Sequence, residues 1–449
     1  MVKFRVQTVI VLLFIATSTQ VVYASDGLAE SARGALAKAT AYLGSISTNG
    51  GYVGIYSLDL KRRYGESIYE KARANEIWVQ PPGTPSVGKA FLRAYKATKN
   101  QRYLTAARNV ARALAWGQRE IGGWDHRVRV DHLKPDSVQP ERAKGRCTFD
   151  DNISQEALSF LMAIDQILDE GWLTESVELG LQFMLKSQFA NGAWPQWYPL
   201  RGGYSNNYTF NDNSINDCIR VMMEAHKHYG KKEYLDSAQR GGDFMFLSQG
   251  KPPQAGWAQQ YDEDLKPSWA RSFEPPGICS AATGRNIRTL VDLYLYTKNG
   301  KYLKPIPAAI DWLKRSQIKP NLWGRIYEVG SNKPIYGDRR DGNKVHYDYE
   351  KVSEFEQTHY GWRGEYGINS AINYYERVKQ LGPDKYISQR DKSLTAKQRQ
   401  ARARSLAGRV KAVISDQDKD GRWKRGEEIH IADFVVNINT LSGYLELIK

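Results

Sequence analysis

Four stretches of the chain repeat one pattern of apolar and polar positions. In each, a short polar turn ending in leucine precedes an apolar run with helical spacing, and a glycine–aromatic segment follows. The turn leucines are Leu104, Leu173, Leu235 and Leu303, which lie 69, 62 and 68 residues apart. Self-similarity at such a period is typical of one supersecondary unit repeated along a chain. The pattern predicts a mainly helical fold built from stacked antiparallel helix pairs.

A second helix precedes three of these turns, and each of these helices opens at a phenylalanine followed by acidic or amide residues. The three clusters are Phe149-Asp150-Asp151-Asn152, Phe210-Asn211-Asp212-Asn213 and Phe273-Glu274. In an antiparallel helix pair, the first helix begins and the second ends at the same face. The acidic clusters, the glycine–aromatic segments and the arginines beside them should therefore gather on one face, which we call the rim.

Outside the repeats, the chain contains further helices and one long irregular segment. Apolar periodicity predicts helices over residues 31–46, 86–97, 388–414 and 431–448. Residues 324–366 are polar and aromatic, and we expect an irregular excursion with short strands such as residues 344–349. A loop of that length inside a compact domain is usually functional. One domain is expected over residues 25–449, with residues 25–84 as a helical and irregular segment packed on it.

Residues 1–24 have the composition of a secretory signal peptide. Lys3 and Arg5 precede an apolar core at residues 9–16, and cleavage is expected before Ser25. The apolar core is too short to span a membrane, and no other stretch is long enough. We therefore expect an exported bacterial protein, extracellular or periplasmic, with no membrane span once the signal is removed.

The net charge of +15 favours an anionic partner. Nucleic acid is a poor candidate, because the chain has no recognisable nucleic-acid motif and begins with a signal peptide. An acidic polymer outside the cell fits better. A purely solubilising role for the excess lysine and arginine is the alternative.

Asp150, Asp151 and Asp212 occupy equivalent places at the predicted starts of two helices. Helix capping is one explanation, since Asp and Asn are preferred N-cap residues and negative charge suits a helix N-terminus. Capping needs one acid per helix, however, and the first cluster has two adjacent carboxylates. Clustered carboxylates and amides with no histidine nearby in the sequence are hard oxygen ligands, for which Ca²⁺ is the natural ion. We expect these aspartates to bind Ca²⁺, with capping alone as the alternative.

Four arginines lie in segments that the repeat places on the rim: Arg271, Arg325, Arg339 and Arg340. A guanidinium group binds a carboxylate through two parallel hydrogen bonds. A lone arginine would more often form a surface ion pair, but several on one rim suit a polymer of uronic acids.

Trp194 and Trp197 lie in the glycine–aromatic segment Gly192–Tyr198 and could stack on sugar rings. A regularly repeated aromatic residue is also commonly part of a core, so packing at the rim is the alternative. Both tryptophans are candidate substrate contacts.

An acidic loop near the C-terminus matches the spacing of an EF-hand calcium loop. Asp416, Asp418, Asp420 and Glu427 stand at positions one, three, five and twelve, with Gly421 at position six. The flanking helices are not a clear EF-hand pair, and short acidic loops match this pattern by chance. A surface turn is the preferred interpretation, and a second calcium loop is the alternative.

Several of these segments together resemble the family-ten pectate lyases, secreted bacterial enzymes with an α/α toroid. The resemblance covers most of residues 85–366. Its most specific pieces are Thr84–Gly88, Thr148–Ser154, Gly192–Pro199, Phe210–Asp212, Trp269–Pro275, Arg325–Asn332 and the following Arg-Asp-Gly triplet. The resemblance implies a single catalytic domain with the α/α-toroid fold, an incomplete ring of helix hairpins.

The resemblance also implies β-elimination of polygalacturonate, the acidic chain of pectin, by a monomeric enzyme. Calcium would be held by Asp150, Asp151 and Asp212, and an arginine would take the proton from C5 of the sugar. Counting without a gap from Arg325 assigns this base to Arg339, whereas matching the Arg-Asp-Gly triplet assigns it to Arg340.

In the same comparison, Arg271 and Arg325 match the clamps that hold substrate carboxylates, and Asp151 and Asn152 are further candidate substrate contacts. The chain departs from the family at Phe355-Glu356-Gln357, where relatives carry an arginine. One carboxylate contact is therefore missing or supplied elsewhere.

Two other functions remain open on the sequence. The first is a helical-toroid glycoside hydrolase, in which Asp150 or Asp151 would act with Asp212 as general acid and base. The second is a pectin-binding protein without catalytic turnover. The two aspartate clusters and the paired arginines favour the lyase over both.

Overall fold

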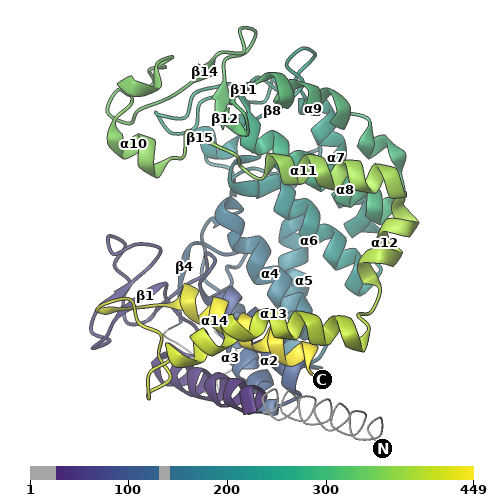
Figure 1. The fold of residues 1–449 in the computed structure, drawn as a ribbon. Coiled ribbons are helices and arrows are strands. Elements are labelled where there is room, and N and C mark those ends of the chain that lie inside the picture. The colour runs from purple at the N-terminus through teal and green to yellow at the C-terminus, as the bar shows by residue number, and fades with distance from the viewer. Residues whose placement is uncertain (1–26, 131–141) are drawn as a thin grey trace, which may run out of the picture. The chain divides into compact units, whose positions relative to one another are not determined.

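The computed structural model describes residues 27–130 and 142–449 (Figure 1). The predicted signal peptide lies outside the described residues. The described chain divides into two compact units. Unit 1 takes residues 27–116, 127–130 and 393–449, and unit 2 takes residues 117–126 and 142–392. That these units act as the single domain expected from the sequence stays a prediction.

Unit 1 combines elements from both ends of the chain. Its helices are residues 27–46, α2 (Thr84–Thr98), α3 (Gln101–Gly117), α13 (Ala396–Ser415) and α14 (Ile431–Leu447). Its strands are β1 (Ile55–Ser57), β2 (Arg63–Tyr64), β3 (Glu76–Trp78), β4 (Arg127–Arg129) and β16 (Glu428–His430). Helix α14 packs against α2 and α13, and β1 pairs antiparallel with both β2 and β16. The N-terminal and C-terminal parts of the chain thus share one small sheet and one helical layer.

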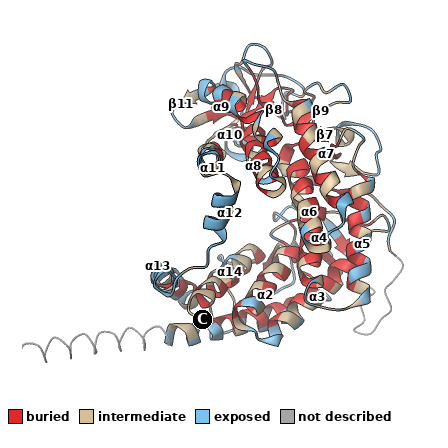
Figure 2. Cartoon of the chain, turned by 90° about the vertical axis from the view of Figure 1, so that its right-hand side faces the viewer, coloured by how far each residue is buried: buried red, intermediate tan, exposed pale blue. Residues whose placement is uncertain are grey.

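Unit 2 contains the predicted helix pairs. They are α4 (Ile153–Asp165) with α5 (Gly171–Lys186), α6 (Ser214–Tyr229) with α7 (Lys232–Ser248), and α8 (Ser280–Thr297) with α9 (Ile306–Arg315). The first helices of the pairs contact one another, α4 with α6 and α6 with α8, and most of their residues are buried (Figure 2). Helix α11 (Ile368–Leu381) covers α8, and α12 (Pro383–Asp391) follows it. The predicted mainly helical α/α-toroid class is confirmed.

Short strand pairs form the rim of unit 2. They are β5 (Cys147–Thr148) with β6 (Trp197–Tyr198), β7 (Tyr208–Thr209) with β9 (Gln260–Tyr261), and β10 (Ile278–Cys279) with β13 (Ile326–Tyr327). Each pair joins the residues before the first helix of one hairpin to the residues after its second helix. The prediction that these segments share one face is therefore correct.

The repeated tryptophans pack inside the hairpins. The indole N–H of Trp194 donates to the carbonyl of Met184 at 2.9 Å, that of Trp257 to Met245 at 2.8 Å, and that of Trp323 to Leu313 at 2.7 Å. All three side chains are 0–1% exposed. The predicted sugar contact is therefore wrong for Trp194, because a fully buried ring offers no face to a ligand.

The excursion at residues 324–366 is ordered around a small core of its own. Phe273 from outside the excursion joins Ile326, Ile335, Tyr336, Val352 and Trp362 in one buried cluster. Val345, Tyr349 and Tyr360 pack against it, and the excursion also contains helix α10 (Glu354–His359) and strands β14 (Pro334–Ile335) and β15 (Arg363–Gly364). The predicted strand at residues 344–349 is wrong, since only His346 forms a bridge there, with Tyr336.

The basic helix predicted over residues 388–414 is two helices. Helix α12 ends at Asp391, and α13 begins at Ala396 after a capping box in which Thr395 and Gln398 bond each other's backbone N–H. This box, Thr-x-x-Gln, is a helix start signal that the periodicity alone did not reveal.

Among the described residues, no helix is long and apolar enough to cross a membrane.

Candidate active site

Two turns of matching sequence, Thr-Phe-Asx-Asp-Asn, lie at the starts of α4 and α6. In both, the aspartate and the asparagine that follows have left-handed backbone: φ is 47° and 59° at Asp151 and Asn152, and 45° and 65° at Asp212 and Asn213. Two consecutive left-handed residues other than glycine are unfavourable, and such conformations cluster at functional sites. The structural counterpart of Asp212 is therefore Asp151.

The two turns are fixed by hydrogen bonds to each other. Gln155 Nε2 donates to the carbonyl of Phe149 at 2.8 Å and to that of Ser214 at 3.2 Å. Ser214 Oγ also donates to the carbonyl of Phe149 at 3.0 Å. The residues that cap α4 and α6 are Asn152 and Asn213, and neither makes a side-chain capping bond. Helix capping therefore does not explain the aspartates.

Asp150 has the environment of a cation ligand. Its Oδ1 is buried and has no hydrogen-bond partner among the described residues. Burial and the charge of Asp212 raise the pKa of Asp150. A buried carboxylate oxygen without a donor is costly unless a cation satisfies it. The carboxylates of this face thus fit a hard divalent cation, with Asp150 and Asp151 as its natural holders and Asp212 contributing charge.

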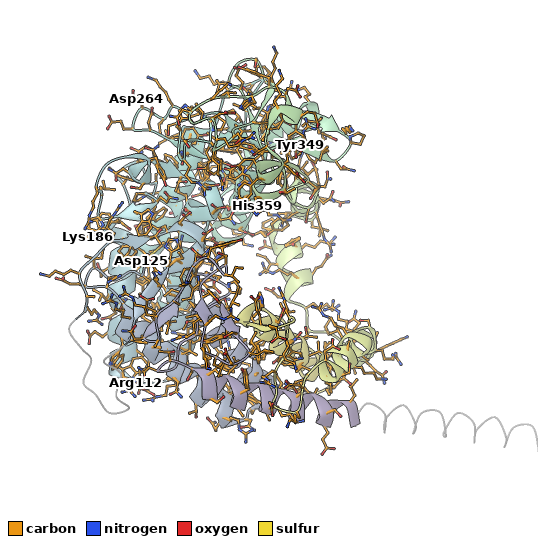
Figure 3. The ribbon with its side chains drawn as sticks, turned by 90° about the vertical axis from the view of Figure 1, so that its left-hand side faces the viewer. Arg112, Asp125, Lys186, Asp264, Tyr349 and His359 are labelled. Carbon is orange, nitrogen blue, oxygen red and sulfur yellow. The ribbon has the colours of Figure 1, made fainter. Side chains whose placement is uncertain are left out.

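His126 is a member of this cluster that the sequence analysis missed. Ligand atoms of His126, Asp150 and Asp151 all lie within 4.8 Å of one another. The ring of His126 stacks on Trp197, with centroids 5.6 Å apart, and its Nδ1 lies 3.1 Å from Oδ1 of Asp125, which Figure 3 labels. Burial lowers the pKa of His126, but the bond to Asp125 and the charges of both aspartates outweigh it and raise the pKa. His126 follows the glycine–aromatic pair Gly123-Trp124, which the repeat places on the rim. The repeat could therefore have indicated His126 as a site residue.

Three exposed arginines each form an ion pair with a buried carboxylate. Arg271 pairs with Glu274 at 2.7 Å, Arg339 with Glu356 at 2.5 Å, and Arg340 with Asp338 at 2.7 Å. The carboxylate side chains are 0–2% exposed, whereas the arginine side chains are 43–60% exposed. Each guanidinium is therefore fixed on one side and open on the other, which suits the binding of a second carboxylate.

Arg325 is held by neutral groups instead. Its Nε donates to Oε1 of Gln259 at 2.8 Å, and its guanidinium lies 4.7 Å from the ring centre of Tyr360. The hydroxyl of Tyr360 donates to Oε1 of Glu274 at 2.6 Å. Tyr360 thus links Arg325 to the Arg271–Glu274 pair.

The charge of Asp212 also acts on Arg325, and Arg271 is an arginine whose charge interacts with both Asp150 and Asp212. Its pKa is raised chiefly by its bond to Glu274 and also by the charge of Asp212. Its own charge acts on Asp150, against the effects of burial and Asp212. Arg339 joins the same group through Phe273, whose ring lies 4.3 Å from its guanidinium and 4.8 Å from that of Arg271. The pKa of Arg340 is raised by its bond to Asp338 and by the charges of Asp341 and Glu356.

The sequence profile of the pectic acid lyase family matches residues 129–321 and 317–371, which together are more than half of the chain. The chain belongs to the pectic acid lyase family. It is a polysaccharide lyase, and the resemblance drawn from the sequence is correct.

Solved structures share the fold of part of this chain. A family 10 polysaccharide lyase from Cellvibrio cellulosa superposes with a TM-score of 0.51 at 22% identity, covering 66% of this chain and 98% of that one. A mutant of a family 10 lyase from the same organism, in complex with trigalacturonic acid, gives a TM-score of 0.50 at 19% identity over the same shares of the two chains. No curated protein sequence matches the chain.

Two further predicted substrate contacts of this lyase have partners within the protein. The amide of Asn152 accepts a bond from Arg220 at 3.0 Å and donates to Glu156 at 3.3 Å, and its substrate contact stays a prediction. Trp197 is partly exposed, with the guanidinium of Arg146 5.3 Å from its ring centre. A substrate contact at Trp197 stays a prediction.

In the acidic loop near the C-terminus, an arginine side chain pairs with two of the aspartates. Arg422 pairs with Asp418 at 2.8 Å and with Asp420 at 2.9 Å. Asp418 also accepts the backbone N–H groups of Asp420 and Arg422. These ion pairs favour the surface turn, and calcium binding by Asp416, Asp418, Asp420 and Glu427 stays the alternative prediction.

Proposed function

We propose that this protein is a secreted, calcium-dependent pectate lyase that cleaves polygalacturonate by β-elimination. The observation that carries the proposal is the unsatisfied buried Oδ1 of Asp150, within the field of both Asp212 and Arg271. A bound cation would be coordinated by that oxygen. The arginines of the site carry positive charge, which would bind the carboxylates of a polyuronate. The signal peptide predicted from the sequence supports export.

Each group has a task in this reaction. A bound Ca²⁺ would draw electron density from the uronate carboxylate and so acidify the neighbouring C5–H bond. Arg325, and those of Arg271 and Arg339 that do not act as the base, would hold substrate carboxylates, because each presents N–H donors at a fixed position. The base removes the C5 proton, and the electron pair of the C5–H bond forms the C4–C5 double bond. The C4–O4 bond breaks, and its electron pair leaves with O4. The departing O4 takes up a proton.

The identity of the base is a choice among arginines. The sequence assigned it to Arg339 or Arg340. Arg271 is a third candidate, and the charges favour it, because Arg271 interacts with both Asp150 and Asp212 whereas Arg340 interacts with Asp338, Asp341 and Glu356. An arginine has a pKa above ~12, so activity should rise toward alkaline pH whichever arginine acts.

The activity is tested by incubating the protein with polygalacturonate and recording the ultraviolet absorption of the new double bond. The product should form with Ca²⁺, stop with a chelator, and return when Ca²⁺ is restored. Mg²⁺ and Mn²⁺ serve as comparison ions. Absence of unsaturated product under all of these conditions at alkaline pH would refute the proposal.

The base is tested by replacing Arg271, Arg339 and Arg340 separately with lysine. Loss of the base should lower kcat by roughly 100-fold or more while polygalacturonate still binds, as expected when a proton-transfer group is removed. Loss of a clamp should raise KM as well. If none of the three variants loses kcat selectively, none of these three arginines is the base.

A glycoside hydrolase is the second candidate, and one observation favours it. The pKa of Asp150 is raised, as a general acid requires. A hydrolase would produce new reducing ends without ultraviolet absorption and would work in chelator. A binding protein without turnover would retain polygalacturonate and leave its chain length unchanged.

A further inference from the structure

Helix α13 carries an unusual concentration of positive charge. Among its 20 residues are six lysines and arginines and no acidic residue. The cations are Lys397, Arg399, Arg402, Arg404, Arg409 and Lys411. In the part of the chain that the structure describes, none of them forms an ion pair with an acidic side chain, and most are exposed (Figure 2). These charges are therefore available to a partner.

A groove of about 670 Å³ runs beside this helix within unit 1. One wall is α13, and the other is formed by Leu28 and the C-terminal end of α14. Ala403, Ala407, Tyr444 and Leu447 contribute apolar surface to it. The groove thus combines an apolar lining with a charged edge.

The charged edge is regular. Lys397, Arg404 and Lys411 line the groove and are seven residues apart, so they lie on one face of α13 at intervals of about 10.5 Å. Arg399 lines the groove as well, whereas Arg402 and Arg409 do not. A row of evenly spaced cations matches a linear polymer that carries one negative charge on each repeating unit.

We propose that this groove is a second, non-catalytic binding site for polyuronate chains. The carboxylates of the polymer would meet Lys397, Arg404 and Lys411, and the apolar faces of its sugar rings would lie on the partly exposed Ala407 and Leu447. The choice of polymer rests on the proposed function. The site itself does not share residues with the candidate active site, because its lining belongs to unit 1 and the active-site residues belong to unit 2.

An anionic membrane surface is the less suitable occupant. Helices that lie on membranes insert large apolar side chains between the lipids. Helix α13 exposes no large hydrophobic side chain. Its apolar contribution to the groove is alanine, which is too small to anchor a helix in lipid.

Two charge-matched variants test the proposal. The groove variant is Arg404→Gln/Lys411→Gln, and the control variant, on the same helix but outside the groove, is Arg402→Gln/Arg409→Gln. Both lose two charges from exposed positions, so their net charge is equal. Affinity for long polygalacturonate is measured by electrophoresis through a gel that contains the polymer. A chelator is present so that the polymer is not cleaved during the measurement.

The groove variant should bind long polygalacturonate roughly three- to tenfold more weakly than the wild type, and the control variant should change less than about twofold. Added salt should weaken wild-type binding more steeply than binding of the groove variant. The kcat and KM for trigalacturonate should be the same in all three proteins. Equal losses in both variants, or no loss in either, would overturn the proposal.

The same gel assay separates this proposal from the proposed function. If the protein yields no unsaturated product but the groove variant alone loses affinity, the binding site stands and the lyase assignment fails. Heparin and vesicles of anionic phospholipid serve as alternative polyanions. Selective loss of binding to either of these, with polygalacturonate unaffected, would assign the groove to a different partner and overturn the proposal.

Discussion

Arg339 is held by Glu356, a carboxylate with no solvent-exposed surface. The Nε of Arg339 lies 2.5 Å from Oε1 of Glu356, and the arginine side chain itself is 43% exposed. The other oxygen of the carboxylate, Oε2, has no hydrogen-bond partner among the described residues. Glu356 stands in the Phe355-Glu356-Gln357 segment, where the family resemblance implies an arginine. The chain thus has a buried acid that positions an arginine supplied by a different segment.

Replacing the two partners of this pair should have unequal effects on stability. Arg339→Ala leaves a buried carboxylate without its cation and should cost about 2–4 kcal/mol of unfolding free energy. Glu356→Gln leaves a half-exposed arginine that water can solvate and should cost about 1 kcal/mol. The double variant should be more stable than Arg339→Ala alone. Denaturant unfolding of the four proteins measures this, and strictly additive losses would show that the pair is not coupled.

Asp150→Asn should have opposite effects on stability with and without calcium. Without the ion, the substitution removes a buried charge that repels Asp212, so the Tm should rise. With Ca²⁺ present, the wild type gains binding energy that the variant lacks, so their order should reverse. Thermal unfolding in chelator and across a Ca²⁺ series measures this crossing. A variant whose Tm rises with Ca²⁺ as strongly as that of the wild type would remove Asp150 from the ion site.

The sequence was sufficient to predict the face on which the site lies, because the helix-pair repeat places both aspartate clusters and Arg325 on the rim. It did not predict what holds these residues. Glu356 lies 17 residues from Arg339 in an irregular segment with no periodicity, so nothing local indicates their pairing. His126 was within reach, because its segment belongs to the repeat. His126 stands 24 residues before Asp150 in the sequence, so only the rim prediction links the two.

Glu274→Gln should destabilise the protein most at neutral pH. Burial opposes the charge of Glu274, but bonds from Arg271 and Tyr360 outweigh it and lower the pKa of this carboxyl. A lowered folded-state pKa contributes stability above the unfolded value of about 4.3, and that stability is lost as the pH falls through the folded-state pKa.

The free energy of unfolding of the Glu274→Gln variant and of the wild type should therefore differ at pH 7 by about 1–3 kcal/mol and converge at acidic pH. Denaturant unfolding between pH 7 and pH 3 measures the difference. Glu263→Gln, at an acid of the same unit that forms no ion pair in the described chain, is the matched control and should show no such trend. A constant difference across the range would mean that the charge of Glu274 does not stabilise the fold.

Trp194 and Trp197, three residues apart, should respond to substitution in different ways. Trp194→Phe removes the bond to the carbonyl of Met184 and leaves a cavity in a fully buried site, so it should cost about 2–4 kcal/mol of stability. Its KM for polygalacturonate should not change.

Trp197→Ala should leave stability nearly unaltered, because the ring is partly exposed, and should raise KM several-fold if the ring contacts substrate. Thermal unfolding and steady-state kinetics on both variants separate the two roles. A raised KM in Trp194→Phe at full stability would contradict the structural role given to Trp194, and an unchanged KM in Trp197→Ala would remove Trp197 from the substrate contacts.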